Sequence, residues 1–312
     1  MGVAGATLAG LIFPDGGRAL LDMGAVDVGI VTMMLISGMK IPFERFKEVL
    51  RRPLPAVAAL ISIFCLAPPV ALAAAHVLGF DAAADRLAVL ILAAQATTLA
   101  TAIVLTETAG GDTALAVVVS VSSNLLSALV TPAVFQLFCD AEVHVDQSAM
   151  IHSLLLKIAV PVAVGQLLRI PFKAFVTKHA KRLSFVSQAL ILIILYAGIS
   201  SGHAQLEGGG VIVRVIGWAL LLHGTMLLLN ALMARVLIRT SETRTAFVLS
   251  ASQKTLPAAI LIWHNQFSHL PLGISAAVSH HIIQLVVDSL LAPAFRSLPL
   301  IRRKTARGRE SL

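Results

Sequence analysis

The chain has 312 residues, of which 57% are hydrophobic and only 13% are charged, and its formal net charge is +8. A soluble domain carries about 25% charged residues, so this composition excludes that class and indicates a polytopic, all-α membrane protein. The positive charge lies in short loops and a tail between apolar segments, which excludes a nucleic-acid-binding surface.

Ten apolar segments follow one another along the chain. We predict membrane spans at about 1–13, 22–39, 53–78, 86–109, 112–138, 149–169, 183–201, 211–238, 242–264 and 270–295. A span needs about 20 residues to cross the hydrocarbon core, and the first segment is shorter than that.

The basic residues divide the loops into two sets. Nineteen of the 24 Lys and Arg residues lie at 40–52, 169–182, 235–244 and 296–309, which the ten spans place on one side of the membrane. The other loops carry acidic residues, namely Asp81, Asp85, Asp140, Glu142, Asp146 and Glu207. By the positive-inside rule, we expect a bacterial inner-membrane protein with both termini in the cytoplasm.

Five spans in each half force the two halves into opposite orientations. We therefore predict two inverted five-helix repeats, residues 1–145 and residues 146–312 with the basic cytoplasmic tail. Many secondary transporters share this arrangement.

The fourth and ninth spans have polar centres at matching positions of the two halves. These are "QATTLATAIVLTET" at 95–108 and "SASQKTLP" at 250–257. Hydroxyls and amides can satisfy backbone groups where a membrane helix unwinds, so we predict that both spans are broken. Thr97, Thr98 and Thr101 are candidate binding residues of the fourth span. The alternative for them is helix–helix packing, where threonine is common.

Lys254 is the most unusual residue of the ninth span. An ammonium at the bilayer centre costs roughly 2.5–3.5 kcal/mol, so it normally has a function. Pro257 follows three residues later and disrupts helical hydrogen bonding. The inner N-termini of two broken helices carry partial positive charge, and together with Lys254 they would suit an anion. The alternative is a lysine that snorkels to the interface. The candidate binding residues here are Ser252, Gln253, Lys254 and Thr255.

A second polar stripe lies in the tenth span. His280, Gln284 and Asp288 are spaced by four and share one helix face, with His281 beside them. These side chains could carry protons, or they could lock the tenth helix to a neighbour. His280 and His281 are adjacent and point in different directions, and a zinc-protease HExxH motif is absent, so we expect no metal site and no enzyme.

Three stretches together resemble a known family. They are "LTETAGGDTALAVVVSVSSNLLSALVTPAVFQLF" at 105–138, "ASQKTLPAAI" at 251–260 and "HHIIQLVVDSLLAP" at 280–293. The chain resembles the bile acid:sodium symporter superfamily, in its divergent SBF-like branch, which is grouped loosely with cation/proton antiporters. The resemblance implies a panel of the first, second, sixth and seventh helices. It also implies a core of the remaining six, with the fourth and ninth helices broken and crossing.

The residues at the family's sodium positions depart from its pattern. The resemblance aligns those positions with Ala102, Ile103, Ala116, Ser120 and Leu249, of which only Ser120 offers a side-chain oxygen. Ser120 and Asn124 are kept as candidate binding residues. Lys254 stands where the family has an asparagine, so a fixed ammonium could substitute for the ion.

We therefore expect a secondary transporter that works by alternating access on an organic anion or acidic metabolite. It would not be coupled to sodium at the family's usual site. Transport would instead be coupled to protons, or to no ion. The alternatives are a cation/proton antiporter and a regulatory membrane protein that moves no solute. The expected partners are a small anionic substrate, the lipid bilayer and protons, with no cofactor and no nucleic acid.

The charge pattern gives a direct test of topology. A reporter fused after Leu312 should be cytoplasmic, and one inserted near Asp146 should be periplasmic, because loops rich in Lys and Arg stay in the cytoplasm. Fusions with alkaline phosphatase and green fluorescent protein measure this. A periplasmic C-terminus would contradict both the ten-span count and the inverted repeat.

Overall fold

The structure is a computed structural model that describes residues 2–40, 49, 51–139, 145–202 and 209–295. This part of the chain is built from helices and contains no strand. The helices, with two π-helical turns η1 and η2, are α1 (Gly2–Ile12), α2 (Pro14–Asp22), α3 (Ala25–Lys40), α5 (Leu54–Ile61), η1 (Ser62–Leu66), α6 (Ala67–Val77), α7 (Ala83–Ala93), α8 (Ala100–Thr108), α9 (Thr113–Phe138), α10 (Gln147–Leu154), η2 (Leu155–Ala159), α11 (Val160–Lys178), α12 (Ala180–Gly202), α13 (Gly209–Leu237), α14 (Ser241–Ser252), α15 (Leu256–Gln266) and α16 (Pro271–Phe295).

Within the described residues, seven helical runs are long and apolar enough to cross a membrane. An eighth is added if α2 and α3, which meet at a bend of 74°, are one span. The predicted all-helical membrane fold is therefore confirmed, whereas the count of ten spans stays a prediction. The short α2 is a difference from the sequence analysis, which expected no helix between its first two segments. Pro14 is at the first turn of α2, where a proline costs no hydrogen bond.

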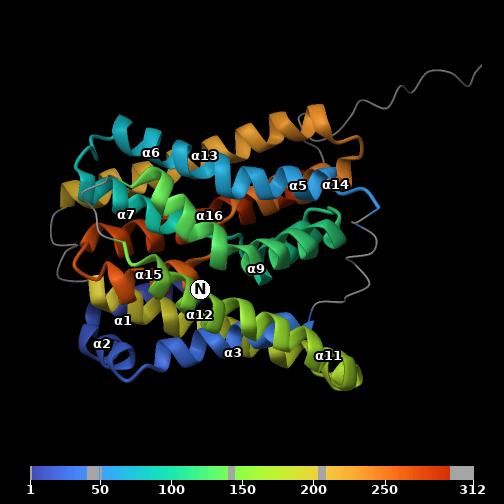
Figure 1. Cartoon of the computed structure of the whole chain (residues 1–312), viewed down its shortest axis with the longest axis horizontal. Coiled ribbons are helices and arrows are strands. Elements are labelled where there is room, and N and C mark those ends of the chain that lie inside the picture. The colour runs from blue at the N-terminus through green and yellow to red at the C-terminus, as the bar shows by residue number, and fades with distance from the viewer. Residues whose placement is uncertain (1, 41–48, 50, 140–144, 203–208, 296–312) are drawn as a thin grey trace, which may run out of the picture.

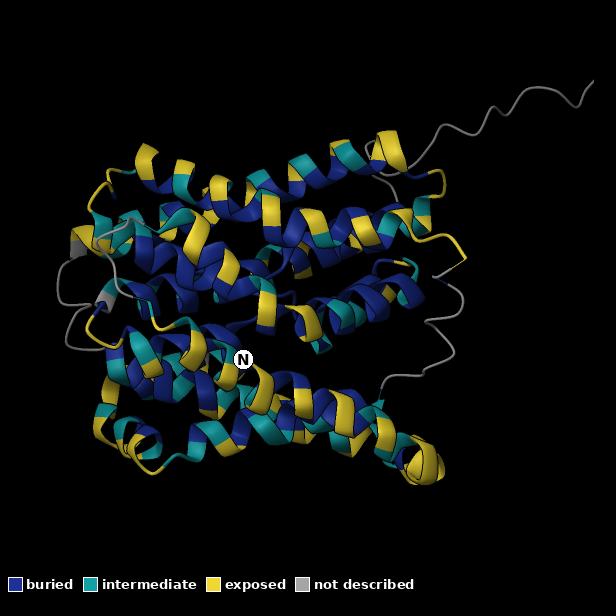
Figure 2. Cartoon of the chain, in the orientation of Figure 1, coloured by how far each residue is buried: buried dark blue, intermediate teal, exposed yellow. Residues whose placement is uncertain are grey.

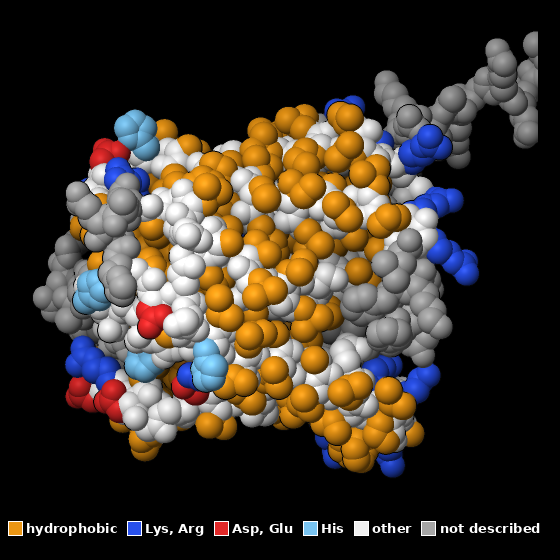
Figure 3. Space-filling view, in the orientation of Figure 1, with side chains coloured by type: hydrophobic (Ala, Val, Ile, Leu, Met, Phe, Trp, Pro, Cys, Tyr) orange, Lys and Arg blue, Asp and Glu red, His pale blue; other side chains and the backbone are white. Residues whose placement is uncertain are grey.

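The helices pack into two groups, which lie one above the other in Figure 1. The first group comprises α1, α2, α3, α11 and α12; the second comprises α5 to α9 and α13 to α16. Buried residues line the inner faces of both groups, as Figure 2 shows. A broad hydrophobic belt covers the middle of the outer surface in Figure 3. Acidic side chains gather at one end together with some Lys and Arg side chains, whereas the charged side chains seen at the other end are Lys and Arg. This belt is the surface that lipid would cover.

The α14–α15 pair lies at the centre of the second group. Its apolar stretch is buried throughout, whereas the other spanning helices expose part of their surface. The helical conformation stops after Ser252 and resumes at Leu256, with Gln253 and Thr255 extended at ψ 155° and 125°. A second non-helical segment, residues 94–99, separates α7 from α8. These two segments position the site described below.

Glycines bring α3 and α11 together in the first group. A Cβ atom added at Gly165 would lie 2.9 Å from the backbone nitrogen of Met39 and 3.0 Å from the Cα of Gly38. Gln166 uses the same close approach, because its Nε2 donates to the carbonyl of Gly38 at 2.8 Å. Small residues are the usual means by which membrane helices approach at the backbone.

Gly165→Ala should therefore destabilise the protein. The added methyl group meets backbone atoms that cannot move aside, and such overpacking typically costs about 1–3 kcal/mol. Gly224→Ala is the matched control, since a Cβ atom there meets nothing within 4 Å. The melting temperature in detergent should fall for Gly165→Ala and stay level or rise for Gly224→Ala. Equal melting temperatures would contradict the close approach.

Candidate functional site

The two non-helical segments are in contact, and the carbonyls of residues 94–97 each receive a separate donor. The backbone N–H of Thr255 donates to the carbonyl of Ala96 at 2.9 Å. Thr131 Oγ1 donates to the carbonyl of Ala94 at 2.8 Å, and Asn124 Nδ2 donates to that of Thr97 at 2.9 Å. An unpaired backbone group inside a bilayer costs several kcal/mol, so these side chains make the unwound segment possible.

Lys254 supplies the remaining donors from the other segment. Its Nζ donates to the carbonyls of Ala93 at 2.7 Å, Gln95 at 2.9 Å and Ile63 at 2.5 Å. The side chain is only 1% exposed. An ammonium has three N–H donors, and here all three are used by backbone oxygens. We call these three oxygens the carbonyl cage.

The sequence explains why the carbonyl of Ile63 is free for this contact. Residues Ser62–Leu66 form the π-helical turn η1, in which the N–H of Ala67 bonds to the carbonyl of Ser62. In that register the next carbonyl, on Ile63, would pair with residue 68. Pro68 has no N–H, so the Lys254 ammonium takes its place. π-Helical turns of this kind often occur at functional sites.

This environment differs from the expected one. The sequence analysis placed Lys254 beside the N-terminal ends of two broken helices, with its charge directed at an anion. The ammonium instead lies against the C-terminal end of α7, where carbonyls carry partial negative charge. The reason is that the non-helical segments of the two interrupted spans are in contact, and the flexible lysine side chain reaches the C-terminal end of α7, whose carbonyls attract a positive charge. No donor of the ammonium is left over for a substrate.

Gln284 fixes the backbone of Lys254. Its Oε1 accepts from the Lys254 N–H, and its Nε2 donates to the Lys254 carbonyl, both at 2.9 Å. Nε2 also lies 3.0 Å from Nδ1 of His281. The amide thus replaces the helical partners that Lys254 lacks, and the predicted polar stripe of α16 does contact the break between α14 and α15.

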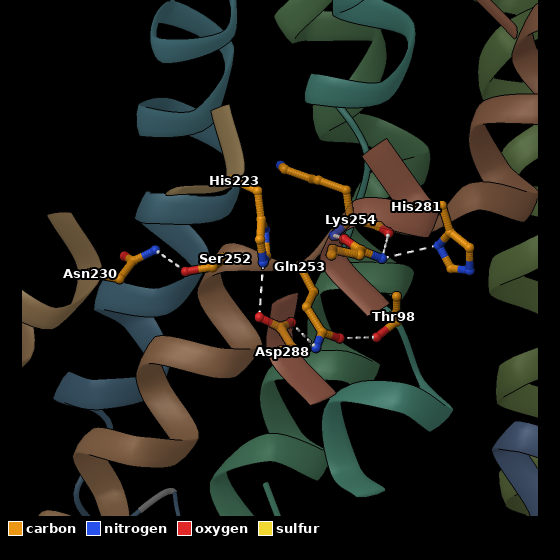
Figure 4. A network of polar contacts seen from close by, with 9 residues as sticks. Thr98, His223, Asn230, Ser252, Gln253, Lys254, His281 and Asp288 are labelled. Carbon is orange, nitrogen blue, oxygen red and sulfur yellow. Dashed lines mark hydrogen bonds and ion pairs between the residues drawn. The ribbon is translucent and has the colours of Figure 1, made fainter. Parts of the chain in front are cut away.

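A chain of hydrogen bonds runs from α13 to the segment before α8, as Figure 4 shows. His223 Nε2 lies 2.8 Å from Asp288 Oδ1, and Gln253 Nε2 donates to Asp288 Oδ2 at 2.6 Å. Thr98 Oγ1 donates to Gln253 Oε1 at 2.6 Å. Asp288 therefore pairs with a histidine and an amide, and Lys254 extends away from it (Figure 4). No hydrogen bond or ion pair between Lys254 and Asp288 is described.

His223 was missed by the sequence analysis, and so was Asn230. Both are fully buried on α13. Asn230 accepts from Ser62 Oγ at 2.6 Å and donates to Ser252 Oγ at 3.0 Å, which ties the predicted residue Ser252 to η1. The signal was present in the sequence. Two polar residues seven apart in one span lie on one helix face.

A small cavity of about 30 Å³ separates the two helix groups beside this network. Four predicted residues line it from the second group, namely Thr98, Thr101, Thr255 and His281. Met33, Met34 and Ser37 of α3 and Ser187 and Ile191 of α12 line it from the first group. In this conformation the groups are closed against each other at the polar layer.

The remaining predicted residues lie in the non-helical segment 94–99 and in α9. Thr97, Ser120 and Asn124 are fully buried, and each keeps one side-chain oxygen without a hydrogen-bond partner among the described residues.

No cluster of three or more His, Cys, Asp or Glu side chains that could hold a metal ion occurs in the described ranges. Asp27, at the start of α3, pairs with Lys157 of η2 at 2.5 Å, so it belongs to the first group and is remote from this network.

Comparison with known proteins identifies a transporter family. The model of the SBF-like CPA transporter family matches residues 1–297. The chain is 29% identical over 218 residues to the probable sodium/metabolite cotransporter BASS4, chloroplastic, of Arabidopsis thaliana, covering 64% of this chain and 50% of that protein. It is 25% identical over 274 residues to the uncharacterized sodium-dependent transporter YocS of Bacillus subtilis (strain 168), covering 82% and 84%.

A vertebrate protein belongs to the same set of relatives. Sodium/bile acid cotransporter 7-B of Xenopus laevis is 25% identical over 220 residues, covering 66% of this chain and 62% of that protein. The matched part of this chain spans about half the length of the Arabidopsis protein and most of the Bacillus protein. The predicted membership of the SBF-like branch is thus confirmed by the family model, and these relatives agree with it.

The carbonyl cage predicts how the protein responds to loss of the ammonium. Lys254→Met removes the donors of three buried carbonyls, each of which costs about 1–3 kcal/mol when left unsatisfied, and it also relieves the desolvation of a charge. We expect a net loss of about 3 kcal/mol and a lower melting temperature. Ser250→Ala is the control, because the buried Ser250 hydroxyl has no partner among the described residues. A Lys254→Met protein that melts like Ser250→Ala and keeps activity would remove Lys254 from the centre of the mechanism.

Proposed function

The chain belongs to the SBF-like CPA transporter family, and we propose that it is a secondary transporter that moves an organic anion by alternating access without a sodium ion. The observation that carries the proposal is the buried Lys254 ammonium in its carbonyl cage. Relatives are named sodium-dependent transporters or sodium cotransporters, whereas here a covalently attached cation lies between the broken helices.

Backbone carbonyls that converge on one point are typical ligands of a dehydrated monovalent cation, because they replace its water shell. The carbonyl cage has this form, and the lysine occupies it. A tethered cation cannot be exchanged with the solution, so it provides the same positive charge in every step of the transport cycle. Cation/proton exchange, the alternative reading, needs a cation that leaves its site, and the carbonyl cage does not offer one.

We infer that the two helix groups act as panel and core. The small residues of α12 support this, since a Cβ atom on Gly198 would lie 2.9 Å from Cδ1 of Ile260 and one on Gly202 would lie 2.8 Å from Cγ2 of Ile274. A helix face without protruding side chains allows one group to slide or rock on the other. The ten-span inverted repeat, divided near residue 145, fits the positions of the two helix breaks, one in each half.

The substrate would bind where the two groups meet. The cavity of about 30 Å³ is lined by three threonine hydroxyls and an imidazole, which can bond to a carboxylate when the groups move apart. Because the Lys254 donors are all used, its contribution to an anion would be electrostatic attraction through the protein interior rather than a direct contact. The expectation of an anionic substrate therefore stays, and its ligands become Thr98, Thr101, Thr255 and His281.

The carbonyl cage makes a prediction about cations. The melting temperature of the wild-type protein should be the same in sodium, potassium and choline chloride, since the cage is occupied. Lys254→Ala empties the cage, so free sodium or potassium should raise its melting temperature relative to choline by mass action. Lys157→Ala, which removes a lysine of the other helix group, is the control and should gain no such dependence. Stabilisation of the wild-type protein by sodium alone would refute the tethered-cation proposal.

Transport itself is tested in two stages. Thermal shift of the purified protein against acetate, benzoate, succinate and phosphate identifies which anion stabilises the folded state. Uptake of that anion into proteoliposomes is then measured with and without sodium and pH gradients. Flux that does not change when sodium is removed supports the proposal. Flux that requires a sodium gradient, or the absence of flux for every anion that binds, contradicts it.

A further inference from the structure

The hydrogen-bond chain from His223 to Thr98 has a property that the proposed function does not use. Its four members are almost fully buried, with Thr98 the most exposed at 5%. One end is a carboxylate paired with an imidazole, and the other end is a hydroxyl that lines the cavity. Only one residue, Gln253, lies between Asp288 and Thr98, and it contacts both at 2.6 Å.

The directions of these hydrogen bonds depend on the charge of Asp288. An ionised carboxylate only accepts, so the Gln253 NH₂ group points to it and the amide oxygen takes the Thr98 proton. Thr98 Oγ1 also accepts from the backbone N–H of Ala102 at 3.0 Å. In this state the Thr98 hydroxyl has no proton to offer to the cavity.

A proton on Asp288 Oδ2 would reverse the chain. The carboxylic acid then donates, so the Gln253 amide turns its oxygen to Asp288 and its NH₂ group to Thr98. Both lone pairs of Thr98 Oγ1 are then used by N–H groups, of Gln253 and Ala102, and its own proton is free. A free hydroxyl proton at the cavity is a donor for a carboxylate.

We propose that Asp288 and His223 form a proton-binding site whose state is transmitted through Gln253 to Thr98, so that a proton and an anion bind together. This deepens the proposed function and rests on its anionic substrate. A hydronium ion gives its proton to Asp288 Oδ2 and leaves as water, while His223 donates a hydrogen bond from Nε2 to Oδ1. One O–H bond of hydronium breaks, the O–H bond of the carboxylic acid forms, and no other covalent bond changes.

The charges around the site favour the same coupling. An ammonium on Lys254 and an ionised Asp288 would balance each other's charge in one buried polar layer, so a proton on Asp288 would leave the lysine charge without its counter-charge. An anion in the cavity would restore the balance, because charges attract strongly in a medium of low dielectric. A fixed lysine is thus a reason for a proton, rather than a sodium ion, to accompany the substrate.

The titratable groups near Asp288 come from three elements. His223 lies on α13, Lys254 between α14 and α15, and His280 and His281 on α16 itself. The rings of His223 and His280 are 5.5 Å apart, edge to face, and neither His280 nitrogen has a partner among the described residues. Other titratable side chains of helices packed on α16 include Asp85, Arg86, Glu107, Lys181, Arg182, Tyr196, Arg214, Arg235 and His264. None of these has a described hydrogen bond or ion pair with Asp288.

Infrared spectroscopy of the purified full chain tests the proton site without a substrate. A pH titration should show the C=O band of a buried carboxylic acid that grows as the pH falls and is absent in Asp288→Asn. His223→Gln keeps a donor for Oδ1 and should retain the band, whereas His223→Phe should change the pH at which it appears. If no band depends on Asp288 in a folded Asp288→Asn comparison, or if Asp288 stays ionised throughout, the proposal is overturned.

Thr98 tests the transmission, with Thr101 as its matched control. Both residues line the cavity, but only Thr98 bonds to Gln253. Thr98→Val should move the pH of the Asp288 band, Thr98→Ser should restore the wild-type titration, and Thr101→Val should leave it unchanged. A titration that is the same in Thr98→Val and wild type would disprove the relay.

Measuring proton uptake during anion binding distinguishes this inference from the proposed function. Where benzoate or another anion of the screen stabilises the protein, its binding should be accompanied by proton uptake, and the apparent affinity should rise several-fold on acidification. Anion flux with no proton uptake would refute the inference and leave the transporter proposal standing. If the Asp288 band titrates but the protein moves no anion, the proton site is supported and the transporter proposal is refuted.

Discussion

The Lys254 ammonium in its carbonyl cage is the interaction on which the centre of this structure depends. Two helices stop inside the bundle, at Ala93 and Ser252, and their free carbonyls have no water to bond. One flexible side chain bonds to three backbone oxygens: that of Ala93 at the end of α7, that of Gln95 in the segment after it, and that of Ile63 in η1. Removing such a group would free three oxygens at once, so the helix breaks, the π-helical turn and the lysine form a single unit.

The polar residues around this unit serve two purposes. Asn124, Thr131 and Gln284 complete the backbone hydrogen bonds of the unwound segments, and for them a structural role is a sufficient account. Asp288 contacts the side chains of His223 and Gln253, and no hydrogen bond to a backbone group is described for it; Nδ1 of His223 has no partner among the described residues. A buried ionisable pair of that kind adds little net stability compared with apolar packing, and proton binding is the role we propose for it.

Some relatives of this chain are named as sodium cotransporters or sodium-dependent transporters, and the Lys254 site can be compared with what such a carrier needs. In a sodium-coupled carrier the cation is a ligand whose binding and release accompany the motion. In the function that we propose, a positive charge is part of the chain and stays in place when the helix groups move. If the charge that alternates is not sodium, the polar layer must supply another, and Asp288 is the described buried acid that lies within it.

The sequence by itself determined the membrane fold, the family and the two polar segments that interrupt helices. These follow from local properties, since apolar length, loop charge and a lysine at membrane depth can be recognised without knowing which helices touch. The positions of Gln253, Thr98 and Asp288 were predicted, but their connection into one chain was not. Partners more than 30 residues apart in sequence depend on how the helices pack. The tertiary structure alone brought His223 to Asp288 and turned Lys254 from an expected anion ligand into a cation held by carbonyls. The physical reason is that a flexible ammonium bonds to whichever oxygens lie within its reach. In this protein the tertiary structure decides which oxygens those are, because it brings η1 and the C-terminal end of α7 to the break after α14.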